Sequence, residues 1–189
     1  MNVNQFAKAV LLYEEHKHNA LCIDIETTRF NGSIAVLGAY RPADGLINVN
    51  QLVRGIDLNW ANVRDMFRGV KLLITFNGQK HDIRKIKKAY PGVIDAIPHL
   101  DLYQLAKEVG MGAGLKMLET QFQILREEPY VYWKRKAIKL WRGHMKGNPK
   151  SLPALLAYNA NDCVNLYPLA EELTRMFWSK WLWERMKVY

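Results

Sequence analysis

Hydrophobic and polar positions alternate over residues 20–26, with the period of two that is typical of a β-strand. The apolar odd-numbered positions would point to one face of the strand, whereas Cys22, Asp24 and Glu26 would point to the other. At a rise of about 3.3 Å per residue, the Cα atoms of the two acids lie roughly 7 Å apart. Two ionised acids this close repel each other and are costly to bury without a positive group. A strand that ends at a solvated edge, with Asp24 paired to a lysine, would explain the same pattern.

The strand over residues 20–26 is the first of an expected three-strand meander. Alternating helices and strands follow the meander. Helices are expected over 3–18, from Asp57 or Asn59 to Arg68, over 82–89, from Leu102, and through most of the chain after Leu115; strands are expected over 34–40, 46–53 and 71–76, with a short one ending at Asp101. A loop is expected from Gly143 to Pro149. The order predicts one α/β domain over residues 1–189 with a mixed five-stranded sheet, in which the meander is antiparallel and the two later strands are parallel.

The composition is that of a globular protein, with 49% hydrophobic and 24% charged residues. No apolar run approaches the roughly 20 residues that a membrane-spanning helix needs. The N-terminal residues lack the basic start and apolar centre of a signal peptide. We therefore expect an intracellular, cytoplasmic protein without a membrane partner. Cys22 and Cys163 are too few for a disulfide framework or a thiolate metal site, and Cys22 is expected to be a small core residue.

The charge balance adds a partner class, because 27 Lys and Arg against 18 Asp and Glu give a net charge of +9. A basic domain attracts polyanions, and nucleic acid first among them. The excess is clustered, with eight basic and two acidic residues between Arg126 and Lys150 and a second basic cluster over residues 84–88. A basic surface tuned for solubility would explain the clusters too, but their unevenness favours nucleic acid.

Tryptophans accompany the basic residues from Trp133 to Arg142, as in proteins that bind single strands. An amphipathic helix with Trp133, Ile138 and Trp141 packed on the core would explain this segment equally well. The Trp-rich C-terminus, residues 176–183, is too apolar for a free tail. We expect it to pack on the core or on a second copy of the chain, which leaves a homo-oligomer possible.

Two further acids occupy positions that suggest chemistry. Asp82 lies in the first turn of a helix, just after the carboxyl end of a strand, where ligands collect in α/β sheets. The helix macrodipole alone would also favour an acid there. Asp162 falls on the apolar stripe of the helix that begins near Ser151, where an unpaired carboxylate is costly. Tyr158, one turn earlier, can reach the same space. A core tyrosine and a buried Asp–Lys pair are the structural alternative.

Together, Asp24, Glu26, Asp82 and Asp162 are four acids on three elements that face the expected core or the end of a strand. Carboxylate oxygens are the ligands that suit Mg²⁺ or Mn²⁺. Four carboxylates within a basic domain therefore indicate two divalent cations, Mg²⁺ or Mn²⁺, that activate a water and stabilise an in-line phosphoryl transfer.

These residues form three short motifs. They are Asp24-Ile-Glu26, Asn77-Gly-Gln-Lys-His81-Asp82 and Tyr158-Asn-Ala-Asn-Asp162. In this order and spacing the chain resembles the DEDD superfamily of 3′–5′ exonucleases, which are DnaQ-like and have an RNase H-like fold. The tyrosine four residues before the last acid resembles the DEDDy branch. Residues 23–28 and the segment from Gly114 to Glu119 look most like the YprB-type group of predicted exonucleases. The resemblance covers roughly residues 20–173, and it departs at His81, where the family usually has Phe or Tyr.

The resemblance implies a role for each motif residue. Asp24 would bridge both cations, and Glu26 and Asp162 would complete the site on the side of the nucleophile. Asp82 would hold the second cation largely through water, and the hydroxyl of Tyr158 would orient the attacking water. The residues expected to contact substrate are Thr27, Thr28, Asn77 and His81. For Asn77, fixing the active-site turn is the alternative.

The implied activity is a metal-dependent 3′–5′ exonuclease that hydrolyses phosphodiester bonds and releases nucleoside 5′-monophosphates. The expected partner is nucleic acid with single-stranded 3′ ends. DNA is favoured over RNA, although nothing in the sequence reads a 2′-hydroxyl. Three alternatives stay open: an RNA-processing 3′–5′ exoribonuclease, a non-catalytic nucleic-acid-binding module on the same fold, and an assembly role in which the basic face docks a polyanion.

Overall fold

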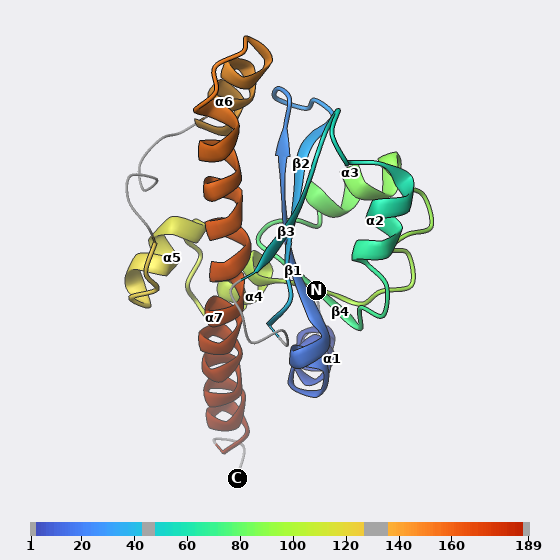
Figure 1. The fold of residues 1–189 in the computed structure, drawn as a ribbon. Helices are drawn as coiled ribbons and strands as arrows, with labels where there is room; N and C mark the ends of the chain where they lie inside the picture. The colour runs from blue at the N-terminus through green and yellow to red at the C-terminus, as the bar shows by residue number, and fades with distance from the viewer. Residues whose placement is uncertain (1–2, 43–47, 127–135, 187–189) are drawn as a thin grey trace.

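The computed structural model describes residues 3–42, 48–126 and 136–186 of the chain. The elements in chain order are α1 (Val3–His16), a 3₁₀ turn (Lys17–Asn19), β1 (Ala20–Thr27), β2 (Ile34–Tyr40), β3 (Val49–Val53), α2 (Trp60–Met66), β4 (Leu72–Thr75), α3 (Asp82–Ala89), β5 (His99–Asp101), α4 (Leu102–Glu108), α5 (Leu115–Gln121), α6 (Lys136–Met145) and α7 (Ser151–Met186) (Figure 1). Each helix and strand predicted from the sequence has a counterpart among them.

The five strands form one mixed sheet in the order β3-β2-β1-β4-β5. β1 pairs antiparallel with β2, and β2 pairs antiparallel with β3. β4 runs parallel to β1, and β5 runs parallel to β4, so the carboxyl ends of these three strands meet at one edge. The α/β class and the division into an antiparallel meander and two parallel strands are confirmed.

Helices cover both faces of the sheet. Figure 1 shows α7 along one face, with α2 and α3 on the other. The core under α7 also takes up residues of α1, α4 and α5, and it includes Cys22, which is fully buried. The opposite core contains Leu21, Ile23 and Ile25, packed with residues of α2 and α3. The alternation predicted for β1 is therefore confirmed, and the even-numbered positions of this strand face α7.

α7 carries the long apolar stripe that the sequence predicted. Its buried members are Leu155, Leu166, Leu169, Ala170 and Leu173. Near its end, Phe177 is buried and Trp178 and Trp181 pack against the same core, so this part of the Trp-rich segment packs on the core. None of the described helices is long and apolar enough to cross a membrane.

Two expectations about segments need adjustment, and a third is confirmed in part. The third strand begins at Val49, and residues 43–47 before it lie outside the described part. The loop expected from residue 143 starts later, because α6 continues to Met145. Of the three residues expected to anchor an amphipathic helix, Trp141 is buried in a small core with residues of β2, β3 and α7, whereas Trp133 lies outside the described residues.

Candidate metal site at the carboxyl end of strand β1

Three acidic side chains converge where the end of β1 lies against α7. Asp24 and Glu26 extend from β1 toward α7, and Asp162 extends from α7 toward the sheet. One carboxylate oxygen of each lies within 4.8 Å of the others. Asp162 is 7% exposed, whereas Asp24 and Glu26 are partly exposed. The structure thus brings together three of the four acids that the sequence singled out.

Asp24 is held by an amide on the facing helix. Asn159 is fully buried, and its Nδ2 donates to Oδ2 of Asp24 at 2.9 Å and to the Asp24 backbone oxygen at 3.2 Å. Gln51 on β3 fixes the orientation of this amide, because its Nε2 donates to Oδ1 of Asn159 at 2.9 Å. Gly38 on β2 provides the room, since a Cβ there would lie 2.0 Å from Oδ1 of Asn159.

The turn after β4 places the fourth acid, Asp82, at the start of α3. Asn77 adopts a left-handed conformation with φ of 57°, and its backbone N–H donates to Asp101 at 2.8 Å. Gly78 is required for packing, because a Cβ there would lie 2.3 Å from Thr75 Oγ1 and 2.8 Å from Asp82 Oδ2. Asp101 also accepts from the backbone N–H of Tyr103, so it caps α4 as well as fixing this turn.

Asp82 is buried near the other acids, but it is not one of the three whose oxygens lie within 4.8 Å of one another. Burial, and then the charge of Asp101, raises the pKa of Asp82 to about 7. Its charge in turn raises the pKa of Asp24 and of Glu26. Asp82 therefore belongs to the same electrostatic site at a greater distance.

Asp162 is paired with an arginine that the sequence did not single out. Arg126, whose side chain is 5% exposed, donates from Nη2 to Oδ1 of Asp162 and to Oε1 of Glu119, the latter at 2.6 Å. Its Nε donates to the second oxygen of Glu119 at 2.9 Å, and Asn165 donates to Glu119 at 3.0 Å. Burial alone would lower the pKa of Arg126, but the hydrogen bond to Glu119 and the charge of Asp162 raise it above its usual value. Arg126 is thus a fixed cation beside Asp162.

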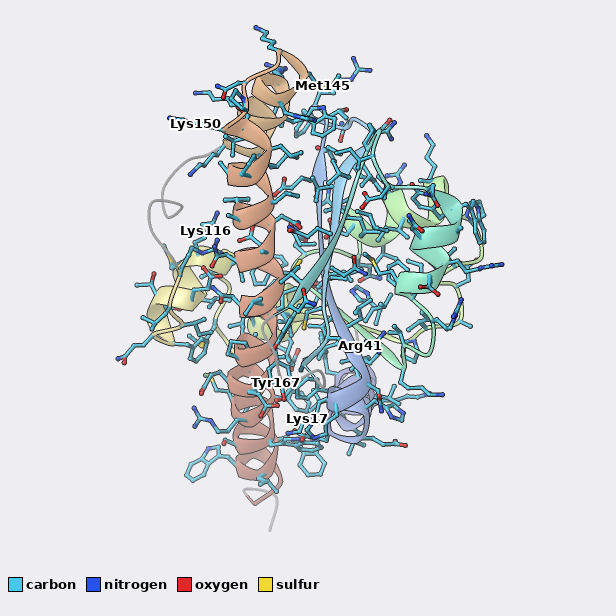
Figure 2. The ribbon with its side chains drawn as sticks, in the orientation of Figure 1. Lys17, Arg41, Lys116, Met145, Lys150 and Tyr167 are labelled. Atoms are coloured by element: carbon cyan, nitrogen blue, oxygen red, sulfur yellow. The ribbon has the colours of Figure 1, made fainter. Side chains whose placement is uncertain are left out.

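Tyr158 lies one helical turn before Asp162, and its hydroxyl meets a lysine of α5. Lys116 donates from Nζ to the Tyr158 hydroxyl oxygen at 2.5 Å and lies 4.0 Å from the centre of the ring. Figure 2 shows Lys116 on α5 beside α7. Burial, and then the charge of Asp162, raises the pKa of Tyr158, so the phenol stays protonated. Because its oxygen accepts from Lys116, its O–H is free to donate elsewhere.

The carboxylates carry more negative charge than their surroundings compensate. Burial, and then the charge of Glu26, raises the pKa of Asp24 well above its usual range. Burial, and then the charge of Asp162, raises the pKa of Glu26 to about 8. Burial also raises the pKa of Asp162, although Arg126 opposes the shift. Closely spaced oxygens short of positive charge are a donor set that fits Mg²⁺ or Mn²⁺.

The residues expected to contact substrate lie at the end of β1 and in the turn before α3. Thr27 and Thr28 are partly exposed at the end of β1, and the Thr28 backbone N–H donates to the Ser33 carbonyl at 3.0 Å. Asn77 lies in the turn before α3, where its backbone fixes the local geometry. His81 is exposed immediately before α3 and makes no side-chain capping hydrogen bond.

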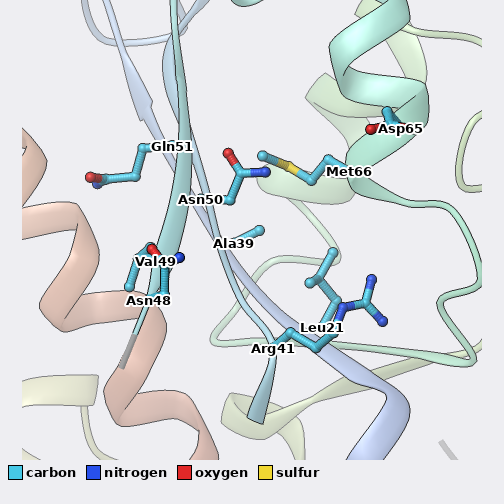
Figure 3. Close-up of a pocket in the computed structure, with 9 residues that line it drawn as sticks. All are labelled: Leu21, Ala39, Arg41, Asn48, Val49, Asn50, Gln51, Asp65 and Met66. Atoms are coloured by element: carbon cyan, nitrogen blue, oxygen red, sulfur yellow. The ribbon is translucent and has the colours of Figure 1, made fainter. Parts of the chain in front are cut away.

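A separate pocket of about 450 Å³ lies at the other end of the sheet, on the face that α2 covers. Figure 3 shows Leu21, Arg41 and Asn50 on the side of the strands that faces Met66 of α2. None of the four acids lines it. It is therefore distinct from the carboxylate cluster, which lies under α7.

The model of the RNase_H superfamily matches residues 21–174, which span the sheet and most of α7. The chain belongs to the RNase H superfamily. Comparisons with curated proteins and with solved structures found no match. Superfamily membership indicates a nuclease-type fold, and RNase H-like nucleases use divalent metals, which agrees with the donor set formed by Asp24, Glu26 and Asp162.

Sequence reasoning missed the residues that support the acids. Asn159 lies near the centre of the apolar stripe of α7, so the helical-wheel argument that identified Asp162 could have identified it as well. Lys116 lies in the segment from Gly114 to Glu119, but nothing in that segment indicates that its partner is Tyr158. Arg126 gave no local signal, because its partners Glu119 and Asp162 lie 7 and 36 residues away.

Proposed function

We propose that this RNase H superfamily protein is a metal-dependent 3′–5′ exonuclease of the DEDDy type, closest to the YprB-type group. The strongest support is the convergence of the carboxylates of Asp24, Glu26 and Asp162. Tyr158 lies on α7, the helix that also carries Asp162. The four acids and the tyrosine stand in the order and spacing of the DEDDy motifs.

In the proposed reaction, Asp24, Glu26 and Asp162 would hold one divalent cation, and Asp82 would help to hold a second. When bound, Mg²⁺ or Mn²⁺ offsets the charge of the carboxylates and of the phosphate and makes water more acidic. Asn159 keeps Asp24 in place through its 2.9 Å hydrogen bond. Arg126 occupies one oxygen of Asp162, which leaves the other oxygen for the cation.

The hydroxyl of Tyr158 orients the attacking water. Its oxygen accepts from Lys116, so its proton points away from the ammonium group. Burial keeps the pKa of Tyr158 above its usual value, so the group acts as a hydrogen-bond donor and positions water without taking up its proton. The products are a nucleoside 5′-monophosphate and a strand that is one nucleotide shorter.

The substrate is a single-stranded 3′ end, with DNA favoured over RNA. A net charge of +9 supports a polyanionic substrate. Thr27 and Thr28 offer their hydroxyl groups to the terminal nucleotide, because the Thr28 backbone N–H already donates to the Ser33 carbonyl. Asn77 and His81 lie at the turn before α3, and the exposed ring of His81 is available to a phosphate.

A degradation assay tests the proposal. Single strands of DNA and of RNA, each labelled at the 5′ end in one series and at the 3′ end in another, are incubated with Mn²⁺, Mg²⁺ or EDTA. We expect a ladder that shortens from the 3′ end, released nucleoside 5′-monophosphates, and no reaction in EDTA. The Asp24→Asn and Asp162→Ala variants should be inactive, whereas Asp65→Asn, an exposed acid paired with Arg68, should match the wild type.

Two outcomes would reject the proposal. The first is cleavage that the Asp24→Asn variant retains, which would indicate a contaminating nuclease. The second is strand binding with neither cleavage nor Mn²⁺ binding in calorimetry, which would support a non-catalytic binding module. Faster degradation of RNA than of DNA would favour the exoribonuclease alternative.

A further inference from the structure

A second pocket, of about 300 Å³, lies where the β1–β2 hairpin meets α3. Residues 31–34 of the hairpin form one wall, and Lys85 and Lys88 of α3 form another, with Arg54 beyond the end of β3. The pocket contains three cationic side chains and no acidic one. Such a concentration of positive charge is repulsive unless an anion is present.

Two of these cations are held in place by the hairpin backbone. Lys85 donates from Nζ to the Gly32 carbonyl at 2.7 Å, and Arg54 donates from Nε to the Ile34 carbonyl at 2.6 Å. An ammonium group has three donors and a guanidinium has five, so both retain donors for a ligand. Backbone carbonyls position these side chains without neutralising their charge.

No described carboxylate forms an ion pair with Arg54, Lys85 or Lys88. The neighbouring Lys87 on the same helix shows the contrast, because it pairs with Asp95 at 3.2 Å. Within the part of the chain that the structure describes, the three cations of the pocket therefore have no ion-pair partner.

The pocket adjoins the proposed catalytic end of the sheet. Lys85 follows Asp82 by three residues, about one turn of α3, or roughly 5 Å along its axis. The two side chains are close enough for the charge of Lys85 to lower the pKa of Asp82 in part. The hairpin wall borders the same end of the sheet, since Ile34 pairs with Thr27 at the end of β1.

We propose that Arg54, Lys85 and Lys88 bind a backbone phosphate of the nucleic-acid strand whose 3′-terminal nucleotide lies at the acidic cluster. This inference rests on the proposed function and extends it with a subsite upstream of the bond that is cleaved. A phosphodiester fits because guanidinium and ammonium donors are the usual partners of phosphate oxygens. The subsite reads no base, and it favours strands long enough to reach it.

The test compares Lys88→Glu and Arg54→Gln with Lys8→Glu. Lys8 is an exposed residue of α1 and lies outside the pocket and the acidic cluster, so Lys8→Glu makes the same change in net charge as Lys88→Glu. Binding of a fluorescent 12-nucleotide DNA strand is measured in EDTA by anisotropy over a series of salt concentrations. Steady-state kinetics in Mn²⁺ use this strand and a dinucleotide.

We expect each pocket variant to weaken binding of the 12-nucleotide strand about tenfold, as for the loss of a hydrogen bond to a charged group. The salt dependence should fall by about 0.7 in log–log slope for the lost phosphate contact. KM for the long strand should rise with kcat unchanged, and the dinucleotide should be unaffected. Thermal unfolding of each variant controls for misfolding.

The subsite is rejected if Lys8→Glu weakens binding as much as Lys88→Glu, if binding is unchanged in both pocket variants, or if the dinucleotide is affected equally. Failure of the proposed function is distinguishable, because it would appear as absent cleavage by the wild type, whereas the anisotropy measurement needs no cleavage.

Discussion

The side-chain amide of Asn159 on α7 donates a 2.9 Å hydrogen bond to the carboxylate of Asp24 on β1. This bond crosses from the helix to the central strand of the sheet at the acidic cluster. Gly38 provides the space for the Asn159 amide, and Gln51 orients it. Asp24 is therefore positioned by contacts among three strands and a helix, and not by β1 alone.

Replacement of Asn159 by leucine should weaken metal binding. The variant removes a hydrogen bond that lowers the pKa of Asp24, so more of the carboxyl is protonated and fewer charged ligands are available. Loss of a group that orients a metal ligand typically reduces metal affinity about 10- to 100-fold. Calorimetric titration with Mn²⁺ at pH 7 measures the effect.

The matched control for this prediction is Asn161→Ala. Asn161 lies on the same helix, but its Nδ2 donates to the Ala157 carbonyl at 3.0 Å, within α7. Its loss should leave the Mn²⁺ affinity within about twofold of the wild type. A change of that size is well below the tenfold that corresponds to about 1.4 kcal/mol of binding free energy. Equal Mn²⁺ affinities for Asn159→Leu and the wild type would contradict the positioning role.

Replacement of Lys116 by methionine should lower kcat. Lys116 fixes the Tyr158 hydroxyl through a 2.5 Å hydrogen bond, and the loss of a bond to a charged donor corresponds to about a 10- to 100-fold reduction. Because Lys116 acts through Tyr158, the double variant with Tyr158→Phe should be no slower than Tyr158→Phe alone. Lys107→Met is the control, since Lys107 lies over the Tyr103 ring at 5.6 Å and away from the acids. Additive losses in the double variant would show an independent role for Lys116.

Replacement of Arg126 by leucine should destabilise the fold. Glu119 is 3% exposed and would lose a bidentate partner, and a broken buried ion pair typically costs about 3–5 kcal/mol. Adding Glu119→Leu removes the unpaired charge and should restore more than half of this loss when Mn²⁺ is present to neutralise Asp162. Urea unfolding measures both variants.

The control for this pair is Arg175→Leu. Arg175 pairs with Glu172 at the surface, where its side chain is 70% exposed, so its loss should change stability by less than about 1 kcal/mol. A double variant of Arg126 and Glu119 that is less stable than Arg126→Leu would mean that Glu119 stabilises the fold through other contacts.

Local periodicity was enough to predict the helices and strands and the faces on which Asp24, Glu26 and Asp162 lie. A period of two determines that Asp24 and Glu26 share a face of β1, and a period of 3.6 places Asp162 on the buried stripe of α7. The face on which each acid lies depends only on the geometry of its own strand or helix, and not on how the other elements are arranged.

The supporting contacts could not be predicted, because they depend on which elements meet. The bond of Asn159 to Asp24 spans 135 residues, and the bond of Lys116 to Tyr158 spans 42. The first bond requires α7 to lie at one particular register on β1, and the second requires one particular register on α5. No window of sequence contains either relationship. The requirement for glycine at position 38 is of the same kind, since it follows from the approach of Asn159.

The acidic cluster should make the protein less stable as the pH rises, and bound Mn²⁺ should reverse this loss. Burial raises the pKa of Glu26 to about 8 from an ordinary 4.5, so between these values the folded protein retains a proton that the unfolded chain releases. This contribution to stability is complete below pH 4.5 and is lost as the pH rises through 8, at up to 1.36 kcal/mol per pH unit for one proton. In EDTA, Tm should therefore fall from pH 5 to pH 8.5 more steeply for the wild type than for Glu26→Gln. The difference in Tm between the two proteins at each pH reports on Glu26, because all other titrating groups are common to both. Saturating Mn²⁺ at pH 8.5 should restore Tm in the wild type, because the cation binds the ionised carboxylates and takes the place of the proton. Parallel Tm profiles for the two proteins in EDTA would contradict the raised pKa of Glu26.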